Sequence, residues 1–475
     1  MARIVVIGAG LGSMAAAARL AVAGHRVTVY ESGATYGGGV RRLERDGFGF
    51  DTGPGLLHLP AVYRDLFVKT GKQPLEECVT LTQVDPASRH VFADGTRVDL
   101  PNASRAGTMA ALDAALGAGA GARWGEFMVR AREAWDRTRR PLLEEPQPED
   151  VSALGREPYP APKAGLLRRP TTTLARIGER ELRDPRLAAL LGSYAWSYGF
   201  DPATAPAAAA VLPYMEQTFG SWYVAGGIRA LADAVYERCL QRRVEFVFGT
   251  EVTDVLEERG RATGLVLAGG GTVAADHVVA GAPVPTLYAE QTVGGESGDD
   301  RPHHQPMRTG RVTLCLALRG ARESGAAHRT VVHASGELPT VTVLRPDDPA
   351  LRPDGAHESV TVTATVGIMP SWAEFAERML VQAATAVPDL RERLLWQEVR
   401  TPDDTLLETG AAEVPGPALA GAGGQWLPAA NRSPLPGLYF AGGWSHPGGG
   451  LAHAGMSGAL VAGLIVEGAD FRGSQ

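Results

Sequence analysis

The residues best suited to chemistry in this sequence are the glycines that follow its first apolar segment. Residues 3–7 predict a strand, and the alanine-rich segment after Leu11 predicts a helix. Between them, Gly8 permits a tight turn and Gly10 lets the backbone approach a pyrophosphate. The first N–H groups of such a helix, at the positive end of its dipole, point at the phosphate. This spacing predicts a dinucleotide site.

A carboxylate completes the same pattern. Glu31 ends a second apolar segment, residues 27–31, in the position that follows the second strand of a βαβ unit. An acidic side chain there can accept hydrogen bonds from an adenosine ribose. The pattern departs from its usual form at Ser13, which stands in the position of the third glycine. Serine still permits helix–strand packing, so we expect the unit to form.

A second glycine-rich segment lies near the C-terminus. Residues 437–443 predict a strand that ends in glycines, residues 448–450 are all glycine, and residues 454–466 predict a helix of small residues. Two such segments at opposite ends of a chain are typical of a flavin domain into which a second domain is inserted. The last helix would then direct its N-terminus at the flavin and stabilise negative charge there. A glycine turn that only caps a helix is the alternative.

Taken together, these segments resemble the phytoene desaturase family of FAD-dependent oxidoreductases. The similarity runs through most of the chain, and the matching segments are residues 5–31, 37–54, 222–227, 249–252 and 437–458, the last with the family's His-Pro-Gly-Gly-Gly run. The resemblance implies FAD rather than NAD as the cofactor. It also implies an α/β fold, in which a Rossmann-like FAD-binding domain of the glutathione-reductase or amine-oxidase type carries an inserted α+β substrate domain.

The resemblance also implies which residues hold the cofactor. The ADP and pyrophosphate would lie against Gly8, Gly10, Leu11, Gly12, Glu31, Gly38 and either Arg41 or Arg42, with the backbone of Val252 at the adenine. The ribityl chain and isoalloxazine would lie against Gly442, Gly443, Gly450 and Leu451.

Two histidines of the C-terminal segment are candidate catalytic residues. His446 would lie beside the flavin, where it could polarise the substrate or orient water; the alternative is a hydrogen-bonded loop histidine. His453 would lie one turn into the last helix, facing the flavin cavity or the core. The sequence departs from the family here, because Ala452 replaces a usual proline, and a loop before Pro339 is short. The short loop suits a more polar substrate than a C40 hydrocarbon.

Length and composition predict a two-domain enzyme without a nucleic-acid partner. A chain of 475 residues exceeds what one core usually supports. We expect an FAD-binding domain at residues 1–70, 220–290 and 425–475, and a substrate domain at residues 71–219 and 291–424. The net charge of −7 argues against nucleic-acid binding, which usually needs a basic face.

Metal and membrane-spanning sites are not expected. The three cysteines, Cys78, Cys239 and Cys315, show no CxxC spacing, and the His303–His304 pair has no third ligand nearby. The apolar run at 459–466 is too short for the roughly 20 residues that cross a bilayer. The sequence therefore predicts a cytoplasmic protein. Residues 161–180 carry basic side chains among leucines and indicate either peripheral membrane contact or a solvated basic surface.

Since no catalytic triad, metal cluster or carboxylate pair stands out, the cofactor is expected to carry the chemistry. The resemblance implies dehydrogenation of a small hydrophobic isoprenoid or polyene by hydride transfer to flavin. A reductase or reductive cyclase acting on a polyene macrocycle is one alternative, and a non-enzymatic protein that binds prenylated partners is another. Trp196, Tyr198, Trp222 and Tyr223 could line a polyene cavity or form ordinary core. The oligomeric state is left open.

Overall fold

The computed structural model describes residues 1–161, 172–282, 309–367 and 371–473. A five-stranded sheet is built from three distant parts of the chain. Its order is β19 (Leu438–Phe440), β13 (His277–Ala280), β1 (Arg3–Ile7), β2 (Arg26–Tyr30) and β9 (Glu245–Val247). Every neighbouring pair is parallel, so the carboxyl ends of all five strands lie at one edge. The predicted βαβ unit is confirmed.

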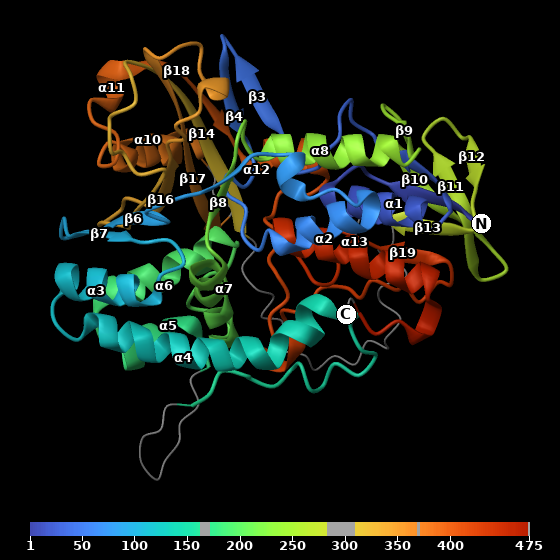
Figure 1. Cartoon of the computed structure of the whole chain (residues 1–475), viewed down its shortest axis with the longest axis horizontal. Coiled ribbons are helices and arrows are strands. Elements are labelled where there is room, and N and C mark those ends of the chain that lie inside the picture. The colour runs from blue at the N-terminus through green and yellow to red at the C-terminus, as the bar shows by residue number, and fades with distance from the viewer. Residues whose placement is uncertain (162–171, 283–308, 368–370, 474–475) are drawn as a thin grey trace.

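The apolar run of β1 is continuous because both faces of this sheet are covered. Ile4 and Val6 pack against a helical layer, whereas Val5 and Ile7 pack against a small antiparallel sheet. The helical layer contains α1 (Leu11–Val22), α8 (Ile228–Gln241) and α13 (Leu451–Val466). The antiparallel sheet contains β10 (Val252–Glu258), β11 (Arg261–Leu267) and β12 (Thr272–Ala274). These elements occupy the right side of Figure 1.

A seven-stranded sheet forms the second large unit, at the upper left of Figure 1. Its order is β18 (Leu394–Arg400), β14 (Thr309–Arg319), β17 (His357–Gly367), β16 (Val341–Leu344), β15 (Arg329–Val332), β6 (Ser88–Val91) and β7 (Arg97–Leu100). Along β14 the even positions, such as Val312 and Leu314, pack on α10 (Trp372–Ala383). Because side chains alternate along a strand, the odd positions face the opposite side.

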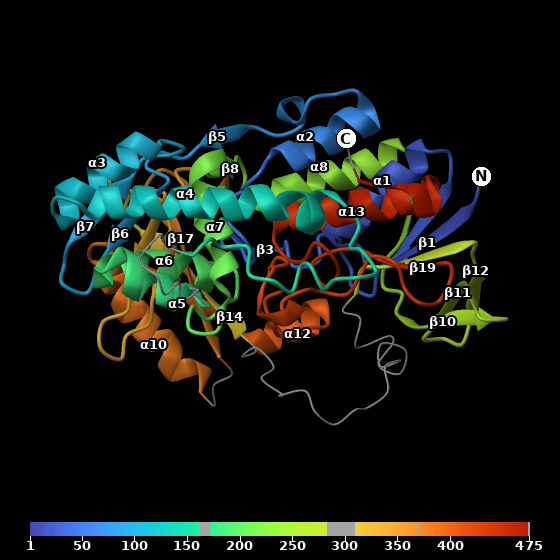
Figure 2. The same cartoon turned by 90° about the horizontal axis from the view of Figure 1, so that it is seen from below.

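A helical layer with its own core lies below that sheet in Figure 1, and Figure 2 shows it from a second side. Its helices are α3 (Arg105–Leu116), α4 (Ala120–Arg139), α5 (Leu174–Ile177), α6 (Pro185–Ser197) and α7 (Val211–Phe219). The other α-helices and strands of the described residues are β3 (Arg42–Arg45), β4 (Phe48–Asp51), α2 (Ala61–Gly71), β5 (Leu81–Gln83), β8 (Trp222–Val224), α11 (Leu390–Arg393) and α12 (Pro402–Thr409).

Each of the two large sheets takes its strands from one of the two expected domains. All five strands of the parallel sheet come from residues 1–70, 220–290 and 425–475, and all seven strands of the other sheet come from 71–219 and 291–424. This distribution supports the two-domain division, which we retain as a proposal.

One predicted boundary was wrong. The last helix begins at Leu451 rather than at residue 454, and its N-cap is Gly450 with a φ of 102°. A side chain at Gly450 would be strained in this conformation, so glycine sets where the helix starts. The unusual Ser13 is accommodated differently: it is buried, and a Cβ on Gly281 would collide with its side chain. Gly281 therefore supplies the close contact that the third glycine of the motif usually supplies.

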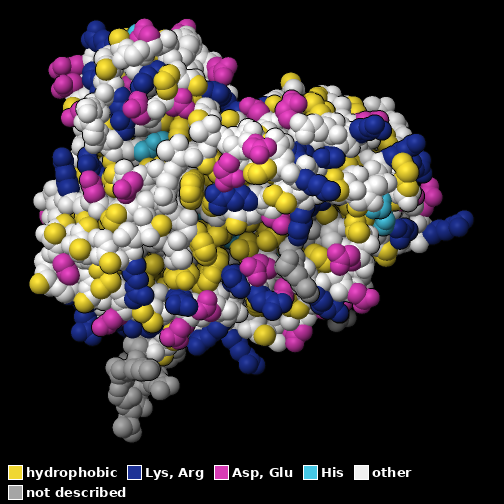
Figure 3. All heavy atoms as spheres, viewed as in Figure 1, with side chains coloured by type: hydrophobic (Ala, Val, Ile, Leu, Met, Phe, Trp, Pro, Cys, Tyr) yellow, Lys and Arg dark blue, Asp and Glu magenta, His cyan; other side chains and the backbone are white. Residues whose placement is uncertain are grey.

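Surface and membrane predictions are tested only in part. No helix in the described ranges is long and apolar enough to span a bilayer. Lys and Arg side chains are interspersed with Asp and Glu over the face shown in Figure 3, and hydrophobic side chains gather near its middle. Half of the basic segment at 161–180, residues 162–171, lies outside the described residues, as does the His303–His304 pair. Among the described residues, no cluster of side chains could hold a metal ion.

Candidate functional site

A cavity of about 800 Å³ is lined by residues from both large sheets and from the helical layer. On the side of the parallel sheet, its lining includes Gly8, Gly10, Leu11, Gly12, Glu31, Gly38, Arg41, Val252, Gly442, Gly443, Gly450, Leu451 and His453. The cavity thus gathers most of the residues singled out from the sequence. Two of the predicted site residues, Arg42 and His446, are not part of its lining.

The turn between β1 and α1 leaves open space where a phosphate would approach. Gly10 is the N-cap of α1, and no side chain caps this helix. A Cβ built on Gly10 would meet no protein atom within 4 Å, so that space belongs to the cavity. Gly12 differs, because its Cβ would lie 2.7 Å from the Cα of Gly442. Gly10 therefore fits the predicted pyrophosphate contact, whereas Gly12 permits close packing of the backbone.

Glu31 is held rigidly at the end of β2. Its Oε2 accepts a hydrogen bond from the N–H of Ala9 at 2.7 Å, and its Oε1 accepts one from the N–H of Gly33 at 2.8 Å. The side chain is buried but forms part of the cavity lining. Each carboxylate oxygen has a second lone pair, so the group can still accept bonds from ribose hydroxyls.

The structure distinguishes the two neighbouring arginines. Arg41 lines the cavity and donates to the backbone oxygens of Gly38 and Glu408 at 3.1 and 2.8 Å. Arg42 instead lies 3.3 Å from Glu44 and donates to the carbonyl of Ala350. Of the two, Arg41 is placed to reach a bound dinucleotide.

A second helix N-terminus opens into the same cavity. Gly450 is the N-cap of α13, again without a side-chain cap, and both Gly450 and Leu451 line the cavity. Helices α1 and α13 pack closely, since a Cβ on Gly458 would overlap the carbonyl oxygen of Gly12. Two positive dipole ends therefore face one cavity, where they would stabilise two separate negative charges. This arrangement fits FAD, which has an anionic pyrophosphate and a ring that becomes negative on reduction.

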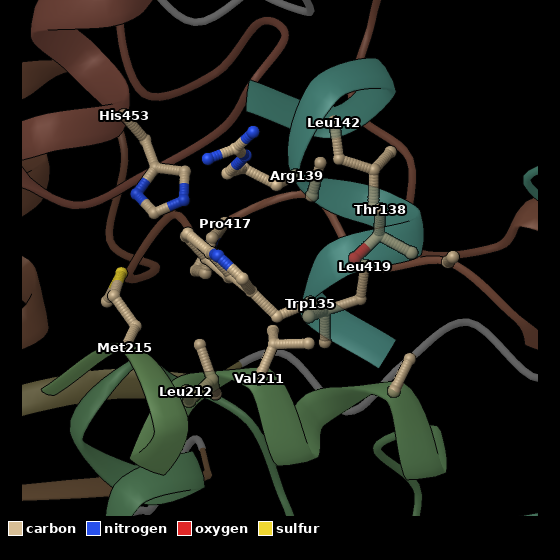
Figure 4. Close-up of a pocket in the computed structure, with 13 residues that line it drawn as sticks. Trp135, Thr138, Arg139, Leu142, Val211, Leu212, Met215, Pro417, Leu419 and His453 are labelled. Atoms are coloured by element: carbon tan, nitrogen blue, oxygen red, sulfur yellow. The ribbon is translucent and has the colours of Figure 1, made fainter. Parts of the chain in front are cut away.

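His453 lies where the cavity meets a smaller crevice. It lines both, and so does Met215. The crevice holds about 30 Å³, and Figure 4 shows the His453 ring extending toward Trp135 and Pro417. Burial lowers the pKa of His453 to about 4. The imidazole is therefore neutral at pH 7 and can accept a proton.

His446 is fully buried and has hydrogen-bonding partners outside the cavity. Its Nε2 lies 2.9 Å from the carbonyl oxygen of Glu145. Its backbone N–H donates to the carbonyl oxygen of Ala429, and its own carbonyl oxygen accepts from the side-chain amide of Asn431. Because a carbonyl only accepts, Nε2 carries the proton, and burial lowers the pKa of the ring to about 4. This geometry favours the structural alternative, and a catalytic role for His446 stays a prediction.

Sequence reasoning missed a charged cluster in the cavity wall. Glu216 and Arg329 are both buried and form an ion pair with 2.9 Å between Oε2 and a guanidinium nitrogen. His58 lies 3.6 Å from the other oxygen of Glu216, and Tyr198 also hydrogen-bonds to this carboxylate. Burial raises the pKa of Glu216, but the attraction of His58 and Arg329 outweighs burial and lowers it overall. The carboxylate is therefore ionised inside the cavity.

The predicted aromatic wall forms only in part. Trp196 and Tyr198 line the cavity, whereas Trp222 and Tyr223 do not. Tyr223 donates instead to Asp348 at 2.7 Å, and Trp222 pairs with Gln83 of β5. Trp222 and Tyr223 both belong to strand β8, which pairs with β5.

Comparisons with known proteins agree with this geometry. The family model described as flavin containing amine oxidoreductase matches residues 14–466. Hydroxyneurosporene desaturase of Cereibacter sphaeroides is 30% identical, with 98% of this chain and 97% of that protein covered. The 4,4'-diapolycopene oxygenase of Methylomonas sp is 28% identical, with 98% of each chain covered.

Solved structures show the same fold. Putrescine oxidase bound to putrescine superimposes with a TM-score of 0.66 at 16% identity, covering 98% of this chain and 99% of that one. Reduced UDP-galactopyranose mutase gives a TM-score of 0.60 at 15% identity, covering 99% and 97%. The predicted fold class, FAD as the cofactor and the resemblance to carotenoid desaturases are confirmed.

Proposed function

Because this chain belongs to the family of flavin-containing amine oxidoreductases and is an FAD-dependent enzyme, we propose that it dehydrogenates a polyene isoprenoid. The observation that carries the proposal is the single cavity shared by the two uncapped helix N-termini and the substrate-side sheet. Cofactor and substrate can therefore meet within one cavity.

In this proposal the parallel sheet and its helices hold the cofactor. Gly8, Gly10 and Leu11 at the start of α1 would bind the pyrophosphate, Glu31 the ribose, and Val252 the adenine. Gly442, Gly443, Gly450 and Leu451 would lie along the ribityl chain and ring. When bound, FAD supplies a two-electron acceptor that takes a hydride from the substrate.

The protein's own residues orient the substrate and receive its proton. Introducing a double bond removes a hydride from one carbon and a proton from its neighbour. The neutral imidazole of His453, in the first turn of α13, is in the form that can accept this proton. Trp196 and Tyr198 give the cavity apolar ring surface against which a polyene can pack.

Anaerobic titration of the purified enzyme with polyenes tests the reaction. We expect a substrate to bleach the visible flavin absorption and to lose two hydrogen atoms by mass spectrometry. A protein that is reduced efficiently by NADPH alone, and whose product gains two hydrogen atoms, would instead be the reductase or reductive cyclase considered above. The short substrate-side loop gives that alternative its support.

A further inference from the structure

One wall of the cavity is polar, although a polyene hydrocarbon would need an apolar one. This wall is the face of the seven-stranded sheet opposite α10. It presents five threonines to the cavity, namely Thr313, Thr340, Thr342, Thr363 and Thr365, together with Arg311, Arg329 and Arg400. The alternation of β14 explains this composition: Val312 and Leu314 fill the core, while Arg311 and Thr313 face the cavity.

The cavity arginines differ in whether they have an acidic partner. Arg329 is paired with Glu216. Arg400 and Arg41 both pair with Glu408, and their guanidinium nitrogens lie 2.5 and 4.0 Å from its carboxylate oxygens. Among the described residues, Arg311 is the cavity arginine for which no carboxylate lies within ion-pair distance.

Arg311 is half-buried in the cavity wall. Its one hydrogen bond to a described residue runs from a terminal nitrogen to the backbone oxygen of Ser197, at 3.0 Å. Burial lowers the pKa of Arg311, and no neighbouring carboxylate offsets this effect. A guanidinium has five N–H donors, so most of them remain available toward the cavity. A charge that is partly withdrawn from water and has no acidic partner is costly, which is a reason to expect a ligand that compensates it.

We propose that the polyene substrate carries a carboxylate that binds the guanidinium of Arg311. The proposal rests on the proposed function and narrows its substrate class from hydrocarbons to polyene acids. Arginine and carboxylate match in charge and in planar geometry, and two parallel N–H bonds can join them. Thr313 and Thr365 lie on the same face of the sheet, and Thr365 is the cross-strand neighbour of Arg311. Their hydroxyls could donate to the same anion.

Binding of a matched pair of probes tests the proposal without turnover. All-trans-retinoate and its methyl ester have the same polyene chain and differ in the carboxylate. Their binding to the FAD-loaded enzyme can be followed by quenching of tryptophan fluorescence, since Trp196 lines the cavity. We expect the wild type to bind retinoate about tenfold or more tightly than the ester, as charge-assisted hydrogen bonds provide. The Arg311→Met variant should lose this preference, and Arg311→Lys should retain part of it.

Arg391→Met is the matched control. Arg391 is an exposed arginine paired with Glu377 outside the cavity, so the variant changes net charge equally and should keep the preference. Equal affinity of the wild type for both probes, or a preference that persists in Arg311→Met, would overturn the inference while leaving the proposed function standing. Loss of FAD from Arg311→Met would assign the residue to the cofactor and also overturn it. Failure of the wild type to bind either probe would count against both proposals.

Discussion

Replacing Gly10 by valine separates cofactor binding from folding more cleanly than other changes in the first turn. The backbone of Gly10 has φ −71° and ψ 164°, which a β-branched residue adopts without strain. Its Cβ would point into open cavity, with no protein atom within 4 Å. The side chain would therefore fill the space of the pyrophosphate while leaving the protein's own packing intact. Replacing glycine in a compatible conformation can even stabilise a fold, by about 0.4–1 kcal/mol.

The expected effect on FAD is large. Charge-assisted hydrogen bonds from backbone N–H groups contribute about 1.5–3 kcal/mol each, and the variant should lose about two of them at the start of α1. The loss of about 3–6 kcal/mol corresponds to a roughly 10²- to 10⁴-fold higher Kd for FAD. The assay is reconstitution of apoprotein with FAD, followed by flavin fluorescence.

The comparison with Gly12→Ala makes the test specific. A Cβ at Gly12 would lie 2.7 Å from the Cα of Gly442 and 2.8 Å from the carbonyl oxygen of Ala454. Overpacking of this kind costs about 1–3 kcal/mol, so urea unfolding of the apoproteins should show a less stable Gly12→Ala and an unaffected Gly10→Val. Urea unfolding must be compared without FAD, because a bound ligand itself stabilises the fold. A Gly10→Val protein that purifies with stoichiometric FAD would refute the assignment of this turn.

Three further outcomes follow from the site. Glu31→Ala should weaken FAD binding about ten- to a hundredfold, which equilibrium titration would measure; an unchanged Kd would remove Glu31 from the ribose site. Arg329→Met should destabilise the protein by up to about 3–5 kcal/mol because the buried Glu216 loses its guanidinium partner and keeps only His58 and Tyr198 beside it, and Glu216→Gln in the same protein should restore much of this loss in urea unfolding. His453→Asn should lower turnover while the protein keeps its FAD content. His446→Asn should mainly lower the stability of the fold. A His446→Asn protein with full stability and lost turnover would restore the predicted catalytic role of His446. The pKa of His446 is about 4 in the folded protein and 6.5 in its ordinary state, so the unfolded chain binds the proton more tightly. The stability of the fold should therefore fall as the pH drops from about 6.5 to 4. His446→Asn should make this fall smaller.

The sequence was sufficient for the parts of the fold that depend on local spacing. The βαβ unit of residues 3–31 combines strand, turn, helix and acid within one short segment, and each of these has its own pattern. The start of the last helix was misplaced because it depends on the left-handed conformation of Gly450, which residue type alone permits but does not require.

The candidate site was harder to predict from the sequence, because tertiary contacts bring its residues together. Glu216, Arg329, His58 and Tyr198 are far apart in the sequence and share no motif, yet they meet in one cluster. A single arginine in a strand usually predicts an exposed edge or an ion pair, so Arg311 carried no signal of its own. Only the register of β14 with β17 turns it toward the cavity.

The same distinction explains why His446 and His453, which lie close together in the sequence, are placed so differently. His453 follows the N-cap of α13 and so inherits the position of that helix N-terminus at the cavity. His446 lies in the loop between β19 and α13, and its backbone is hydrogen-bonded to Ala429 and Asn431. In this chain the helix start therefore predicts contact with the cavity better than proximity to the glycines in sequence does. On this argument the first turn of α13, rather than the loop before it, is where substitutions should alter chemistry without altering the fold.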